Sequence, residues 1–255
     1  MRARSDKVRS RWIAAAAALL LLQGIAEAAE IRLFASGALK EAYLELIPAF
    51  EKASGHKVRL EWSSTTEIRK RVSAGEIHDL VILGDSGTEA LIRDGKLTGT
   101  TRVVFAKSGI SIAVRAGAPR PNVRSADALR KTLLAAKSVG YSEGASGTYL
   151  VGMFQKLGVY DQVKAKAVIA GANIPVGGKV ANGEAEIGFH QLSELLPVKG
   201  IDIIGPLPGD LQYLTVFSGA IHGAATDKDA ARALITFLTA PAAQQVLKKH
   251  GLEPG

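Results

Sequence analysis

The pattern of hydrophobic and polar residues along this chain alternates between the period typical of strands and the period typical of helices. Residues 31–34 are strand-like, and residues 37–54 continue as an amphipathic helix. Its apolar positions recur at spacings of three and four, which places one set on a single helix face: Leu39, Ala42, Tyr43, Leu46, Ile47 and Phe50. Ser36 stands where a helix N-cap stands, and Gly37 lies in the first turn. The stretch therefore predicts a strand that ends by presenting a helix N-terminus, whose free N–H groups and dipole favour an anion.

Further strand and helix patterns alternate behind this first unit. Residues 57–62 and 79–83 read as strands, and a turn rich in Ser, Thr or Asp opens a helix pattern after each of them. Successive strand–helix–strand units favour a parallel sheet with helices on both faces.

Two long extended stretches divide the chain. Residues 102–114 carry two strand-like halves in line, broken near Ser108–Gly109 without a helix between them, as expected where a chain crosses between lobes. A second strand–helix series follows, and the strand pattern at 213–220 is expected to cross back. We therefore predict an α/β protein with two lobes, each a mostly parallel sheet flanked by helices. The predicted boundaries are 29–108 and 216–255 for lobe I and 109–215 for lobe II.

The first 28 residues differ in composition from the rest of the chain. A basic start precedes an apolar run from Trp12 to Leu22, and Ala26-Glu27-Ala28 has the small-x-small spacing of a signal-peptidase site. The run is too short for a comfortable membrane span. Residues 1–28 are therefore predicted to be a cleaved signal peptide, with an uncleaved membrane anchor as the alternative. The mature protein is therefore expected to be exported.

Composition narrows the function classes. The chain has 255 residues and no cysteine, which excludes disulfides, thiol catalysis and thiolate metal sites. Its net charge of +8 is scattered and suits small anions, whereas an aromatic content of 5% argues against a surface that stacks nucleic-acid bases. We expect a monomer that binds a small anionic ligand and no nucleic acid.

Candidate ligand groups lie at the strand-to-helix junctions, because open α/β sheets bind ligands at the carboxyl ends of their strands. A single Ser or Thr at such a junction is more simply a helix cap, but junctions from both halves of the chain would line one cleft. Their hydroxyl, amide and backbone N–H groups bind an oxyanion without a full counter-charge. The predicted ligand-binding residues are Ser36, Gly37, Ala38, Ser64, Thr65, Ser146, Gly147, Thr148, Gly178 and Gln191.

Catalytic and metal-binding signatures find little support in the chain. There is no Gly-x-Ser-x-Gly elbow, no His-Glu-x-x-His and no paired-carboxylate signature. His190 and His222 lack a partner at metal-ligand spacing, and Arg69 and Arg71 are expected on a solvated helix face. Asp85 has the wrong charge for an anion pocket and reads as a cap. We therefore predict no enzymatic activity, no metal site and no cofactor, with a secreted enzyme on the same fold as the least favoured alternative.

Several segments resemble the periplasmic molybdate-binding proteins of ABC importers, which have the type 2 periplasmic binding-protein fold. The similarity runs from residue 30 to the end of the chain and rests on these segments: Phe34-Ala35-Ser36-Gly37-Ala38-Leu39, Ser63-Ser64-Thr65, Asp79-Leu80-Val81-Ile82, Ser146-Gly147-x-Tyr149 and Asn182-Gly183-Glu184-Ala185-Glu186-Ile187-Gly188. The resemblance implies two lobes joined by a two-strand hinge, a ligand enclosed between them, and docking onto a membrane permease driven by a cytoplasmic ATPase.

The ligand positions depart from the family pattern. The first ligand serine of the family falls on Ala38, its second falls near Ser64 or Thr65, and its ligand tyrosine falls at or near Gln191. The pocket thus keeps its positions and changes its chemistry. Molybdate or tungstate is the ligand that the resemblance implies, and an organic anion such as a di- or tricarboxylate is the alternative.

Overall fold

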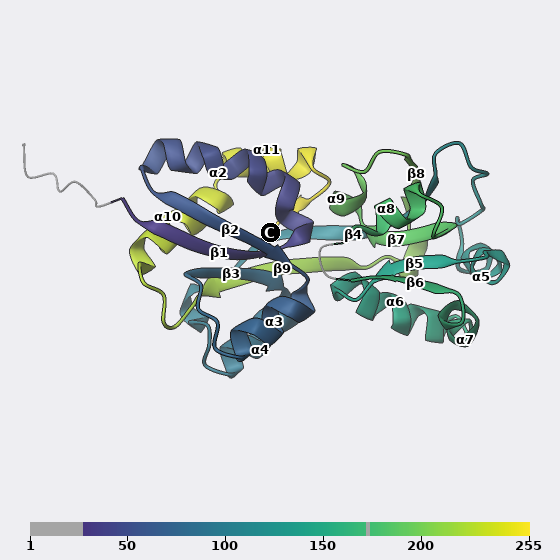
Figure 1. Cartoon of the computed structure of the whole chain (residues 1–255), viewed down its shortest axis with the longest axis horizontal. Coiled ribbons are helices and arrows are strands. Elements are labelled where there is room, and N and C mark those ends of the chain that lie inside the picture. The colour runs from purple at the N-terminus through teal and green to yellow at the C-terminus, as the bar shows by residue number, and fades with distance from the viewer. Residues whose placement is uncertain (1–27, 172–173) are drawn as a thin grey trace, which may run out of the picture.

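The computed structural model describes residues 28–171 and 174–255. Two groups of helices and strands lie end to end, and the long strands β4 (Val103–Arg115) and β9 (Leu214–Ile221) run between them (Figure 1). The predicted signal peptide lies outside the described residues, apart from Ala28. Within the described ranges, no helix combines the length and the apolar character needed to cross a bilayer.

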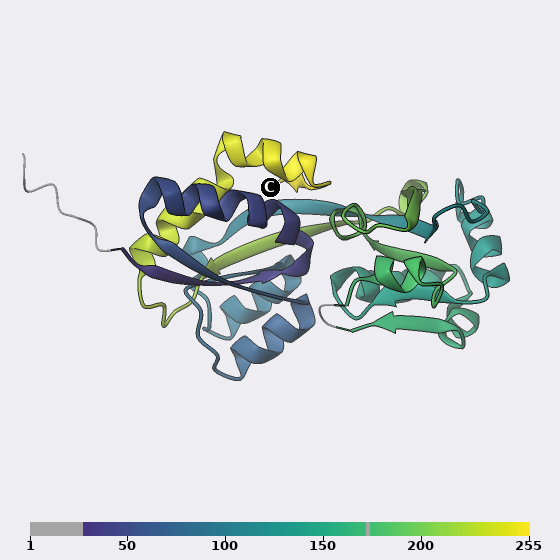
Figure 2. The ribbon, with the colours of Figure 1, turned by 45° about the horizontal axis from the view of Figure 1, so that its top comes forward.

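The first group is built from both ends of the chain. In chain order its elements are β1 (Glu30–Ser36), η2 (Gly37–Leu39), α2 (Lys40–Ser54), β2 (Lys57–Ser63), α3 (Thr65–Ser73), β3 (Leu80–Gly84), α4 (Asp85–Arg93), η3 (Gly99–Thr101), α10 (Lys228–Thr239), α11 (Pro241–Lys249) and β10 (Glu253–Pro254). β1 lies between β2 and β3 and is parallel to both, whereas β9 pairs with β3 antiparallel. α2, α10 and α11 cover one face of this sheet, and α3 and α4 cover the other (Figures 1 and 2).

The second group comes from the middle of the chain. Its elements are α5 (Ala126–Ala135), β5 (Val139–Ser142), α6 (Ala145–Lys156), α7 (Tyr160–Lys164), β6 (Ala167–Ala170), α8 (Val176–Ala181), β7 (Ile187–Gln191), α9 (Leu192–Leu195), β8 (Ile201–Pro206) and η4 (Gly209–Leu211). β5 lies between β6 and β7 and is parallel to both. β4 pairs antiparallel with β7 and β8 here and with β9 nearer the first group, so it ties the two groups together.

Each group has its own hydrophobic core. Along β1, Leu33 and Ala35 pack beneath α2 and α10, whereas Phe34 points to the opposite face and packs with residues of α3 and α4. This strand is therefore buried on both faces, as in other parallel sheets covered by helices on both sides. The second group has a separate cluster around Phe154 and Phe189. The predicted lobe boundaries at 108/109 and 215/216 stay predictions.

Most of the predicted elements are present, with shifts at their ends. Ser64, Ser125 and Asp227 cap α3, α5 and α10, each accepting a hydrogen bond from a backbone N–H of the first turn. Ser36 occupies the N-cap position of η2 but makes no side-chain capping hydrogen bond. The predicted break at Ser108–Gly109 is wrong, because β4 continues through it while changing partners from β9 to β7 and β8.

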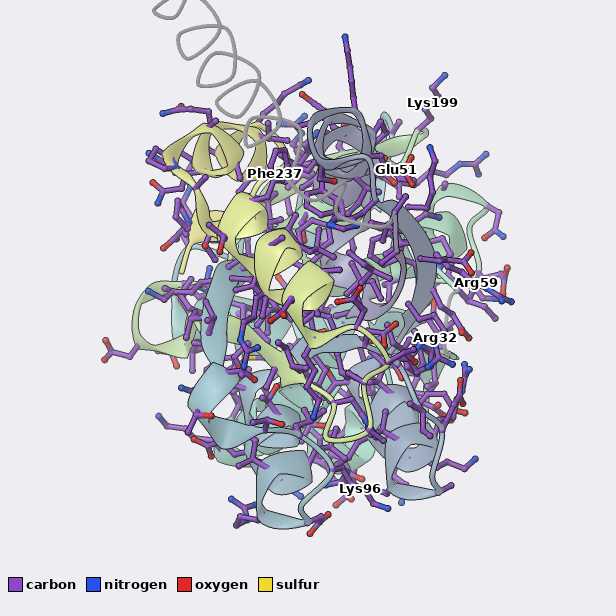
Figure 3. All side chains as sticks on the ribbon, turned by 90° about the vertical axis from the view of Figure 1, so that its left-hand side faces the viewer. Arg32, Glu51, Arg59, Lys96, Lys199 and Phe237 are labelled. Carbon is purple, nitrogen blue, oxygen red and sulfur yellow. The ribbon has the colours of Figure 1, made fainter. Side chains whose placement is uncertain are left out.

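Arg71 does not lie on a purely solvated face, so that expectation is wrong. Its guanidinium lies 4.5 Å from the ring centroid of Phe34 and donates to the carboxylates of Glu61 and Glu76. His78 Nε2 lies 2.8 Å from Glu76 Oε1. The network joins α3 to β2 and to the turn before β3. Arg32 and Arg59, which are neighbours on the paired strands β1 and β2, line the same hollow (Figure 3).

This network makes stability depend on pH in the acid range. The hydrogen bond from Arg71 lowers the pKa of Glu76 from 4.5 to about 2. The stabilisation is therefore complete above pH 4.5 and is lost as the pH falls towards 2, because the unfolded chain takes up the proton first. We expect Glu76→Gln to lower the melting temperature at pH 7 and to have a progressively smaller effect below pH 4.5. A difference between the two proteins that stays constant down to pH 2 contradicts this assignment.

Candidate functional site

A cavity of about 620 Å³ lies between the two groups of elements. One wall comes from η2, α2, β2 and the start of α3, and the other comes from the turns after β5, β6 and β7. Its polar lining residues are Ser36, Lys40, Glu41, Glu61, Ser63, Ser64, Thr65, Ser142, Glu143, Ser146, His190, Gln191, Ser193 and Glu194. The cavity is therefore formed by strand ends of both groups, as predicted for an open α/β sheet.

Two helix N-termini from opposite walls meet at this cavity. Thr66 Oγ1, in the first turn of α3, donates to the backbone oxygen of Glu143, just before α6, over 3.3 Å. A Cβ placed on Gly144 would lie 3.9 Å from Ser64 Cβ, so the two N-caps are close neighbours. The positive ends of both helix dipoles therefore act on the same space, which favours a negatively charged ligand.

The structure brings six of the predicted ligand residues into the cavity lining. They are Ser36, Gly37, Ser64, Thr65, Ser146 and Gln191. The other four lie outside the lining: Ala38, Gly147, Thr148 and Gly178. Ala38 packs into the core of the first group, and Thr148 Oγ1 donates to the backbone oxygen of Gly144. That the six lining residues bind a ligand stays a prediction.

The hydroxyl groups that line the cavity can still donate a hydrogen bond to a ligand. Ser64 Oγ accepts from the backbone N–H of Glu67, and Thr65 Oγ1 accepts from that of Gly84 over 2.9 Å. A hydroxyl that accepts one hydrogen bond still has its own O–H to donate. Ser142 and Ser146 have their oxygens 3.4 Å apart at the start of α6. These groups can stabilise negative charge without carrying positive charge.

His190 and Glu194 form an acid–base pair in the same cavity, which sequence reasoning missed. Glu194 Oε2 lies 3.4 Å from His190 Nδ1, one helical turn apart across the β7–α9 junction. His190 is buried, and the Glu194 side chain keeps 26% of its surface exposed. Burial raises the pKa of Glu194, and the charge of His190 opposes that shift. A carboxylate with a raised pKa is a stronger base than one in water and is suited to proton transfer.

One group of side chains within the described residues has the spacing of metal ligands. Ligand atoms of Glu61, Glu76 and His78 lie within 4.8 Å of one another. Arg71 already donates to both carboxylates and supplies the positive charge that a cation would bring. We therefore interpret the cluster as an ion-pair network.

A ligand-sized cleft between two α/β lobes joined by two long strands defines a two-lobed solute-binding protein with the type 2 periplasmic binding-protein fold. The chain belongs to the family described as "Bacterial extracellular solute-binding protein", whose sequence profile matches residues 31–253.

The named relatives of this chain differ in function. An aconitate isomerase of a Pseudomonas species is 37% identical over 230 residues, covering 88% of this chain and 87% of the relative. A molybdate-binding protein of Azotobacter vinelandii is 27% identical over 238 residues, covering 91% and 92%. A solved structure of a periplasmic molybdate-binding protein from Azotobacter vinelandii superposes with a TM-score of 0.72 at 19% identity, covering 88% of this chain and 99% of that one.

The prediction that this protein has no enzymatic activity is wrong, because the 37% identical relative is an enzyme. That prediction was based on the absence of a nucleophile elbow, of paired carboxylates and of a metal-binding motif from the sequence. An isomerisation by proton transfer requires none of these, since one carboxylate held in an anion-binding cleft is sufficient as acid and base.

Proposed function

We propose that this protein binds an unsaturated tricarboxylate in its cleft and interconverts the cis and trans isomers by moving a proton. The observation that carries the proposal is the Glu194–His190 pair, which lines a cavity that is otherwise rich in hydroxyl and backbone donors. The name of the 37% identical relative supports aconitate as the substrate. An organic anion is also the alternative ligand suggested by Gln191, which stands at or near the position of the ligand tyrosine in molybdate-binding proteins.

The reaction follows from the constitution of aconitate, which is propene-1,2,3-tricarboxylate. A base removes one proton from the methylene carbon, and the electron pair spreads over the allyl unit and its carboxylates. Return of the proton to the far end of the allyl unit regenerates the same compound with its double bond moved. The new double bond forms with either geometry, so atoms and electrons balance without a cofactor.

Residues of both walls would share this chemistry. Glu194 removes and returns the proton, and His190 Nδ1 lies 3.4 Å from its carboxylate. The helix starts of α3 and α6, with the hydroxyls of Ser64 and Ser146, stabilise the negative charge of the carboxylates and of the allylic intermediate. Donors fixed in place before the reaction lower the barrier without reorganising during it.

Capture of a tetrahedral oxyanion such as molybdate is the second candidate, because molybdate-binding proteins are among the named relatives. We also propose export to the periplasm, which the basic and apolar N-terminal segment and the family description support. In this second candidate function, which follows the family resemblance, the protein delivers the captured oxyanion to an ABC permease.

Calorimetric titration separates the two ligand classes. We expect the protein without residues 1–28 to bind tricarballylate, the saturated analogue of aconitate, and to bind neither molybdate nor sulfate at comparable concentration. Tricarballylate carries the three carboxylates but has no double bond to move, so binding is measured without turnover. Binding of molybdate together with no response to tricarballylate would overturn the proposal.

A further inference from the structure

Two buried hydroxyls lie on the strands that connect the lobes. Ser108 on β4 and Thr215 on β9 are directly opposite each other in the antiparallel register. Both reach the β7–α9 junction, where Ser108 Oγ lies 3.4 Å from Ser193 Oγ and Thr215 Oγ1 lies 2.6 Å from the Gln191 amide. All four side chains are buried. The connecting strands therefore hold the same turn that carries His190 and Glu194.

The hydrogen bond between Thr215 and Gln191 can be assigned in two ways. In one, Gln191 Nε2 donates to Thr215 Oγ1. Within residues 28–171 and 174–255, that orientation leaves Gln191 Oε1 without a partner and the Thr215 hydroxyl without an acceptor. The two ends of a side-chain amide are told apart only by their hydrogen-bond partners, so the partners determine the orientation.

Two observations favour the reverse orientation: the short distance between Thr215 Oγ1 and the Gln191 amide, and the number of polar groups that have a hydrogen-bond partner. A separation of 2.6 Å is short for N–H···O, whose distances centre on about 2.9–3.0 Å, and is usual for O–H···O. If the Thr215 hydroxyl donates to Gln191 Oε1, both of the unsatisfied groups gain a partner. The free end of the amide is then the –NH₂ group, which is buried in the wall of the cavity that Gln191 lines.

We propose that Thr215 is a positioning residue, whose hydroxyl donates to Gln191 Oε1 and so keeps the Gln191 amide –NH₂ available as a donor to an anionic oxygen of the ligand. The choice of a tricarboxylate as probe rests on the proposed function, whereas the amide orientation does not. Thr215 lies outside the cavity lining and acts only through Gln191.

Calorimetry with tricarballylate tests the pair through isosteric variants. Thr215→Val removes the hydroxyl that orients the Gln191 amide, so the hydrogen bond from the amide to a charged ligand oxygen is lost and we expect binding to weaken by at least about tenfold. Thr215→Ser keeps the hydroxyl and should stay within about threefold of the original affinity. In a Gln191→Ala background, Thr215→Val should have less than about a twofold further effect, because the two residues act as one unit.

Gln191→Glu tests which end of the amide meets the ligand. It keeps Oε1 and replaces the –NH₂ group with a second, negatively charged oxygen, so we expect it to abolish measurable binding; retained affinity would overturn the inference. Equal affinity of Thr215→Val and the unaltered protein, or an equal loss with and without Gln191, would also overturn it.

If the protein binds molybdate and no tricarballylate, the proposed function fails and the same variants test Thr215 with molybdate. If it binds neither anion, both proposals fail.

Discussion

Glu194→Gln is expected to lower kcat for aconitate isomerisation by roughly 10²–10⁴-fold, the usual contribution of a general acid–base group. The amide keeps the size of the side chain but can neither take up nor return the proton. Because Glu194 is not needed to hold the substrate, the affinity for tricarballylate should change by less than about threefold, or improve through the loss of a like charge. Stopped samples analysed by proton NMR give kcat, and calorimetry gives the affinity.

The pH profile of the same variant adds an independent test. Burial raises the pKa of Glu194, so the unaltered protein should lose activity on acidification at a pH above the ordinary value of 4.5. This acid limb should be absent from the residual activity of Glu194→Gln. Glu89→Gln is the matched control, since it makes the same change at an exposed position of α4, outside the cavity lining. Full activity of Glu194→Gln would remove the residue from the mechanism.

Gly147→Ala is expected to have the largest effect on the fold of the site. A Cβ at this position would lie 1.6 Å from the backbone oxygen of Ser142, so rotating a side chain cannot relieve the clash. The start of α6, which carries Ser146, would have to move away from the β5 turn. We expect destabilisation at or above the upper end of the ~1–3 kcal/mol range of overpacking, and at least about tenfold weaker binding of tricarballylate.

Gly152→Ala is the control within the same helix. Apart from the neighbouring backbone of α6 itself, no atom of the described residues lies within 4 Å of a Cβ built there, and the position is exposed. Removing a glycine from a helix interior should stabilise the protein by about 0.4–1 kcal/mol. Thermal unfolding of both variants tests this prediction. Similar melting temperatures for the two variants would show that the start of α6 tolerates the extra methyl group and would contradict it.

The sequence was sufficient to predict elements that local patterns determine. A serine or aspartate before an amphipathic run marks a helix start, and Ser64, Ser125 and Asp227 cap helices in this way. The helix patterns also indicated that the turns with Ser36, Ser64 and Ser146 belong to one cleft, and all three residues line it. Short helices such as α7 and α9 span too few residues to show a hydrophobic period, so they were not predicted.

The acid–base pair could not be found from sequence patterns. His190 and Glu194 are four residues apart, a spacing with many structural uses, and they become a candidate catalytic pair only because the β7–α9 junction faces η2 across the cleft. A Cβ placed on Gly37 would lie 3.4 Å from Glu194 Oε1, which shows how close the opposite wall comes. Likewise, the contact between Thr215 and Gln191 joins residues 24 positions apart and depends on the strand register.

Proton NMR of the protein in D₂O with pure cis-aconitate, and separately with pure trans-aconitate, tests the central claim most directly. We predict that both samples reach the same mixture of isomers, that deuterium enters the methylene and vinyl positions when the abstracted proton exchanges with solvent, and that Glu194→Gln suppresses the change. Samples that keep their starting isomer at catalytic and at equimolar protein concentration, while the protein is folded, would contradict the account.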